Sequence, residues 1–152
     1  MKVVSRKIIE EYFEDDGKMS ELLNLYQECF DRVDYYEECL RNHVFDNITS
    51  VRESIQELSG LLVAFQKPLS ISITTLENNK VREYHTLKME TESIEGKKFM
   101  SAPTEREASY RVSGFRRARN TFQGYYAVCD RIVGCFQSLL SSLKQEERRP
   151  QQ

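Results

Sequence analysis

Apolar residues in this chain recur in alternating steps of three and four, and few helix-breaking residues interrupt them. An α-helix turns once every 3.6 residues, so this spacing places the apolar side chains on one face. The first two series are Leu22, Tyr26, Cys29, Val33, Tyr36 and Leu40, and then Val51, Ile55, Leu58, Leu62 and Phe65. The pattern predicts an all-α fold of long amphipathic helices that pack as a helical bundle or a coiled coil.

The longest series lies in the last third of the chain and predicts one helix from Glu105 to Glu147. At 1.5 Å per residue such a helix is about 60 Å long, more than a compact monomer of this size requires. We therefore expect a second copy of the chain to cover part of its apolar face, which makes the protein a homo-oligomer. The residues expected at that contact are Phe115, Phe122, Tyr125, Ile132, Phe136, Leu139 and Leu143.

The same series contains one irregularity at Phe115 and Ala118. Two consecutive steps of three, from Val112 to Phe115 and from Phe115 to Ala118, interrupt the alternation. Gly114, Gly124 and Gly134 also lie inside the predicted helix. Each glycine costs a helix about 1 kcal/mol relative to alanine. We interpret the three glycines as points of close packing or as bends.

Helix-breaking and capping residues divide the chain, which we expect to form a single domain over residues 1–152. Pro68 is expected to end a helix, and Thr104 with Glu107 forms a capping box that predicts the start of another. The expected segments are acidic N-terminal helices at 1–67, a middle helix at 69–95, a basic loop at 96–104, a long helix at 105–147 and a tail at 148–152.

The segment after Pro68 fits two kinds of secondary structure. Leu69, Ile71 and Ile73 alternate with serines, as in a short strand. A single strand would have no partner in this chain, so we favour the start of the middle helix.

The composition and the N-terminal residues indicate a globular protein rather than a membrane protein. Apolar residues make up 39 % of the chain and charged residues 30 %, which is typical of a globular protein. No apolar run approaches the roughly 18 residues that a membrane-spanning helix needs, and the N-terminal segment lacks the apolar core of a signal peptide. We expect a cytoplasmic protein, in the host cytoplasm if a phage encodes it, without a membrane partner.

No set of residues predicts catalysis. The two histidines, His43 and His85, stand apart from any nucleophile or carboxylate pattern, and Gly96-Lys97-Lys98 lacks the first glycine and the hydroxyl residue of a phosphate-binding loop. We expect neither an enzyme nor a cofactor, metal or small-molecule substrate. Four cysteines match no zinc-ligand spacing and are expected to be reduced thiols: Cys29, Cys39, Cys129 and Cys135.

Charge is distributed unevenly along the chain. Residues 1–59 carry 7 Lys+Arg against 14 Asp+Glu, whereas residues 96–152 carry 11 against 5. On one continuous helix, four arginines fall within an arc of roughly 100° nearly opposite the apolar face: Arg106, Arg116, Arg117 and Arg131. Such a stripe suits the phosphates of a nucleic acid, with nearby Tyr110 and Tyr126 stacking on bases. The cations expected to bind are Lys97, Lys98, Arg106, Arg116, Arg117 and Arg131.

Two short elements add a resemblance to a known family. Lys80-Val81-Arg82, with Tyr84 shortly after, is similar to a Lys-Ala-Arg element, and Phe99-Met100-Ser101-Ala102 is similar to a small-residue entry into a long final helix. Over about residues 73–147 the chain thereby resembles the UvsY family of phage recombination mediators. The resemblance implies a ring-like oligomer that binds single-stranded DNA through Lys80 and Arg82 and helps load a RecA-class recombinase.

A second interpretation needs no nucleic acid. The acidic N-terminal helices of one copy could pair with the basic C-terminal helix of another, as in a structural piece of a phage particle or an adaptor protein. A helical regulator that inhibits a nucleic-acid enzyme would differ from this only in its partner.

Overall fold

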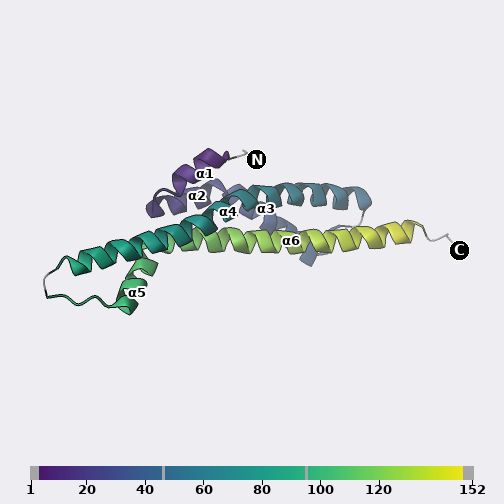
Figure 1. The fold of residues 1–152 in the computed structure, drawn as a ribbon. Helices are drawn as coiled ribbons and strands as arrows, with labels where there is room; N and C mark the ends of the chain where they lie inside the picture. The colour runs from purple at the N-terminus through teal and green to yellow at the C-terminus, as the bar shows by residue number, and fades with distance from the viewer. Residues whose placement is uncertain (1–3, 46, 95, 149–152) are drawn as a thin grey trace. The chain divides into compact units, whose positions relative to one another are not determined.

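A computed structural model describes residues 4–45, 47–94 and 96–148, and these residues contain helices and no strand. Figure 1 shows the elements in order along the chain. They are α1 (Arg6–Tyr12), the 3₁₀ turn η1 (Asp16–Lys18), α2 (Met19–Leu25), α3 (Gln27–Arg41), α4 (Ile48–Glu92), α5 (Ser101–Arg111) and α6 (Ser113–Glu147). The predicted all-α fold is confirmed. Among the described helices, none combines the length and the apolar character that a membrane crossing needs.

Packing groups the chain into two compact units. Of the described residues, unit 1 comprises 26–45, 47–67 and 122–148, and unit 2 comprises 4–25, 68–94 and 96–121. Unit 1 therefore contains α3, the first part of α4 and most of α6. Unit 2 contains α1, η1, α2, the second part of α4, α5 and the start of α6. The single domain predicted from the sequence stays a prediction.

Aromatic side chains fill the core of unit 1. Phe30 of α3 stacks on Tyr125 of α6 with 4.3 Å between ring centroids, and it lies 5.6 Å from Phe65 of α4. Tyr26 meets the ring of Phe122 edge-on at 5.0 Å. Contacts of these kinds stabilise a fold by about 0.5–1.5 kcal/mol each beyond the burial of area. The heptad-like spacing of Tyr26 and Phe65 predicted this core correctly.

Helix α4 does not end at Pro68, so the predicted boundary there is wrong. Pro68 is fully buried, and it belongs to a row of buried residues that runs through both units. A proline inside a helix costs about 3 kcal/mol, because its ring crowds the preceding turn and one backbone hydrogen bond is lost. Burial of the ring offsets part of this cost. The row is Val51, Ser54, Leu58, Leu61, Phe65, Pro68, Ser72, Leu76 and Asn79.

Polar residues in that row hid it from sequence analysis. Ser54 and Ser72 are buried but donate hydrogen bonds to the carbonyls of Ser50 and Leu69, at 2.8 and 2.7 Å. A buried hydroxyl that finds a backbone acceptor avoids most of the cost of leaving water. Residues 69–92 are helical throughout, so the helix favoured for Leu69 and its neighbours is confirmed over the alternative strand.

The predicted helix from Glu105 to Glu147 is also wrong, because it is two helices. Val112 leaves the helical conformation, with φ −104° and ψ 23°, and separates α5 from α6. Figure 1 shows the chain changing direction between these two elements. The break lies beside the irregular steps of the apolar series, which are consistent with a change of helix rather than one continuous face.

Helix α5 begins earlier than the capping box indicated. Its first residue is Ser101, and the Thr104 hydroxyl donates to the Met100 carbonyl at 2.8 Å within the first turn. Pro103 is tolerated at the third position because the first-turn N–H groups have no acceptor inside a helix. The basic loop is therefore shorter than the predicted 96–104.

Candidate nucleic-acid interface

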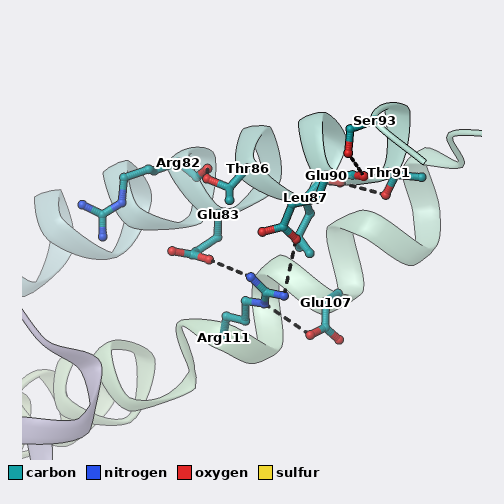
Figure 2. A network of polar contacts seen from close by, with 9 residues as sticks. All are labelled: Arg82, Glu83, Thr86, Leu87, Glu90, Thr91, Ser93, Glu107 and Arg111. Atoms are coloured by element: carbon teal, nitrogen blue, oxygen red, sulfur yellow. Dashed lines mark hydrogen bonds and ion pairs between the residues drawn. The ribbon is translucent and has the colours of Figure 1, made fainter. Parts of the chain in front are cut away.

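Arg111 links helix α5 to the C-terminal part of α4. Arg111 lies 3.4 Å from Glu83, 4.0 Å from Glu90 and 3.4 Å from Glu107. Figure 2 shows its guanidinium group between the carboxylates of α4 and that of its own helix. Glu83 is half-buried and the other three groups are exposed, so water and salt screen most of their attraction. The contact fixes the orientation of α5 more than it stabilises the unit.

The two sides of α5 differ in character. Thr104 and Ala108 are its buried residues. At 100° per residue, Arg106 and Tyr110 fall on the opposite side, one turn apart. Both are exposed, and Tyr110 retains 75 % of its accessible surface. A cation and an uncovered aromatic ring thus share the outward side of one short helix.

Neighbouring carboxylates leave Arg106 unpaired. Glu105 lies 3.5 Å from the Lys80 ammonium group of α4, and Glu107 pairs with Arg111. Within the described part of the chain, Arg106 itself has no ion pair. The two glutamates that flank Arg106 in sequence are therefore paired with cations of α4 and of the end of α5.

The structure separates the predicted cations into two groups. Lys80 is paired with Glu105, and the Arg116 guanidinium donates to the carbonyl of Ser109 at 3.1 Å and to its hydroxyl. These two side chains help to hold unit 2 together. The other predicted cations are exposed and have no ion pair among the described residues: Arg82, Lys97, Lys98, Arg106, Arg117 and Arg131.

The four arginines of the predicted stripe do not lie on one helix. Arg106 is on α5, whereas Arg116, Arg117 and Arg131 are on α6, so the break at Val112 invalidates the arc calculated for one helix. Arg131 also belongs to unit 1, while the other predicted cations belong to unit 2. Figure 2 shows Arg82 outside the network around Arg111. The free cations that remain in unit 2 come from α4, the loop before α5, α5 and α6.

Four of the residues predicted to contact a second copy are covered by their own chain. Phe115, Phe122, Ile132 and Phe136 are buried, and the ring of Phe115 stacks on Phe13 at 6.1 Å. The expectation that they bind a sister subunit is wrong, because side chains of the same chain cover them. Phe30 contacts Phe122, and Tyr36 and Phe45 contact Phe136. The remaining three residues are half-buried: Tyr125, Leu139 and Leu143.

Asp16 is the positioning residue that sequence analysis missed. Its carboxylate accepts hydrogen bonds from the N–H groups of Gly114 and Phe115, at 3.0 and 2.6 Å. These groups lie at the start of α6, where backbone N–H groups lack acceptors and the helix dipole favours a negative charge. A Cβ on Gly114 would lie 2.6 Å from the Asp16 carbonyl oxygen. Gly114 is therefore a point of close packing, which is one of the two interpretations that the sequence left open for it.

The four cysteines differ in burial, and within the described chain they belong to no metal site. Cys29, Cys39 and Cys129 are buried and Cys135 is exposed, and all four are free thiols. Burial raises the pKa of Cys129 to about 11, so this thiol stays protonated at neutral pH. Among the described residues, no group of three or more His, Cys, Asp or Glu side chains is arranged to hold a metal ion.

The fold and these side chains define an all-α protein with a small exposed cationic and aromatic surface on α5. Comparisons with protein-family models, with curated proteins and with solved structures found no match. The resemblance to the UvsY family stays a prediction from the sequence.

Proposed function

We propose that this chain is a non-catalytic accessory protein that binds single-stranded nucleic acid through the outward side of α5. The observation that carries the proposal is the pair of Arg106 and Tyr110, exposed one turn apart on the side opposite Thr104 and Ala108. Phosphates attract the arginine, and an unpaired base stacks on the tyrosine ring. Double-stranded nucleic acid offers no such base, so the aromatic ring favours a single strand.

The number of free cations sets the expected strength. Arg82, Lys97, Lys98 and Arg117 add positive charge in unit 2 without ion pairs to the described residues. Each phosphate that a cation neutralises lowers the logarithm of the affinity by about 0.7 per tenfold rise in salt for a single strand. Binding is therefore weak, tolerant of sequence and sensitive to salt, and an oligomer would raise it by avidity.

Fluorescence anisotropy with a labelled single-stranded oligonucleotide tests the proposal at low ionic strength. Tyr110→Ala should weaken binding by about 1–3 kcal/mol, the range measured for base stacking. Arg106→Ala should reduce the salt slope by about 1 or less. Arg52→Ala and Tyr35→Ala are matched controls, because both residues are exposed but lie in unit 1. Absence of binding by the unmodified chain, or equal losses in the controls, contradicts the proposal.

The finer role comes from the family resemblance. A recombination mediator would speed the assembly of a RecA-class recombinase on a strand already covered by single-strand-binding protein. The rate of that assembly, followed with and without this chain, tests the role separately from binding itself. A chain that binds the strand without changing the rate would keep the nucleic-acid proposal and end the mediator proposal.

A helical adaptor protein is the second candidate, and pairing of charge within unit 2 favours it. The sequence of this unit contains 13 Lys+Arg and 13 Asp+Glu, because acidic residues 4–25 pack with the more basic segment 68–121. Lys80 and Arg111 are partnered by glutamates there. An adaptor would show no affinity for the oligonucleotide at any salt concentration.

A further inference from the structure

A groove lies between α3 and the first part of α4 in unit 1, whereas Arg106 and Tyr110 belong to unit 2. Its volume is about 690 Å³, within the range of sites that enclose small molecules or a few side chains. The buried side chains of Cys29 and Leu61 line its floor. The residues around them that concern charge and access are Glu28, Arg32, Glu53, Glu57 and Gly60.

One of the three glutamates in this groove is already satisfied. The Arg32 guanidinium donates two hydrogen bonds to Glu57, one of them at 2.9 Å, and the Tyr36 hydroxyl donates to the same carboxylate at 2.5 Å. Glu28 and Glu53 have no ion pair among the described residues. The groove therefore has an excess of two negative charges, supplied by one carboxylate on each helix.

Gly60 opens one side of the groove. It is exposed inside α4, and a Cβ placed on it would meet nothing within 4 Å. A glycine at such a position costs the helix about 1 kcal/mol relative to alanine, and no contact with the described residues requires its small size. The space that it leaves lets another backbone approach α4 closely.

We propose that this groove binds the Lys97–Lys98 segment of a second copy of the chain. The apolar floor suits the aliphatic stems of lysine, and Glu28 and Glu53 suit the ammonium groups. The same chain supplies the complement, because Lys97 and Lys98 are exposed in the loop before α5 and have no ion pair to the described residues. Groove and loop are therefore present in equal number, and association needs no other molecule.

The contact has a definite consequence for the assembly. The groove and the loop are different surfaces, so each copy offers one of each and the contact is head-to-tail. Such contacts build rings or open chains rather than closed pairs. The average mass in solution should therefore rise beyond that of a dimer with increasing concentration, and fall as salt is added. The inference does not depend on nucleic-acid binding.

Light scattering at low ionic strength, without nucleic acid, tests the contact by exchange of charge. The double variant Glu28→Lys/Glu53→Lys should be monomeric, and so should Lys97→Glu/Lys98→Glu. An equimolar mixture of the two should associate again, because each acidic surface then faces a basic one. A chain that carries all four substitutions should recover self-association. Circular dichroism confirms that each variant is folded.

A steric variant keeps the test decisive if charge reversal disturbs the fold. Gly60→Leu fills the groove and should stabilise α4, yet weaken association at least tenfold. Gly124→Leu is its control, because Gly124 is also a helix glycine in open space. An unmodified chain that stays monomeric, variants that associate as before, or a mixture that stays monomeric would each overturn the proposal. Binding of the loop to the groove of its own copy would appear as a monomeric mass and also overturn it.

Discussion

Three glycines are spaced by ten residues in α6. Alanine substitution should raise the free energy of unfolding at two of them and lower it at the third. Gly124 and Gly134 have open space where a Cβ would lie, and both are exposed. Alanine there should stabilise the fold by about 1 kcal/mol each, the difference in helix propensity. For a chain of this size, that amount raises Tm by about 2–4 °C.

Gly114 differs because of Asp16. An added Cβ would lie 2.6 Å from both the carbonyl oxygen and one carboxylate oxygen of that residue, so η1 or α6 has to shift. The shift would stretch the two hydrogen bonds that cap α6. Hydrogen bonds to a charged group contribute about 1.5–3 kcal/mol, and helix caps about 1 kcal/mol. After the gain in propensity, Gly114→Ala should still destabilise the protein by about 1–2 kcal/mol.

Urea unfolding followed by circular dichroism measures all three substitutions under the same conditions. We expect the midpoint to fall for Gly114→Ala and to rise for the other two, with an unchanged slope. When Asp16→Ala is also present, Gly114→Ala should lower the free energy of unfolding by less, because the carboxylate no longer contributes. A double-mutant cycle isolates this coupling. A Gly114→Ala protein as stable as Gly124→Ala would refute the close approach of Asp16 to α6.

Three further substitutions or reactions probe other parts of the structure. His43 has φ 52°, and the N–H groups of His43 and Val44 bond the carbonyls of Leu40 and Cys39 at the end of α3. His43→Gly should therefore stabilise the protein by about 1 kcal/mol in urea unfolding, because glycine adopts this left-handed conformation without strain. The hydrogen bond from Arg32 lowers the pKa of Glu57 below its ordinary value of 4.5. Its contribution to stability is then present above about pH 4.5 and lost as pH falls through the folded-state pKa, so the difference between the unmodified chain and Glu57→Gln should shrink in acid unfolding curves. A thiol reagent at neutral pH should modify Cys135, which is exposed, long before Cys129, whose pKa is raised to about 11 by burial; equal rates by mass spectrometry would show that Cys129 is accessible.

Periodicity predicted the helical fold because burial of one face repeats with the helix itself. Tyr26, Val33 and Phe65 could be assigned to the core from spacing alone, and they are buried. Two boundaries failed for a shared reason. The cost of Pro68 is partly offset by burial in a packed row. The start of α6 after the break at Val112 is held by hydrogen bonds that the Gly114 and Phe115 N–H groups donate to Asp16. Both depend on partners far along the chain, which a local pattern does not contain.

The acidic and basic segments of the sequence do not form separate acidic and basic units in the structure. Acidic residues 4–25 belong to the same unit as the basic loop and α5, and this unit contains equal numbers of acidic and basic residues. Net charge by segment is therefore a poor guide to an anionic partner of this protein. What distinguishes Arg106 is that Lys80 and Arg111 occupy the carboxylates on either side of it. A cation freed in this way, next to an uncovered tyrosine, depends on pairing across α4 and α5 and could only be recognised once those helices were placed together.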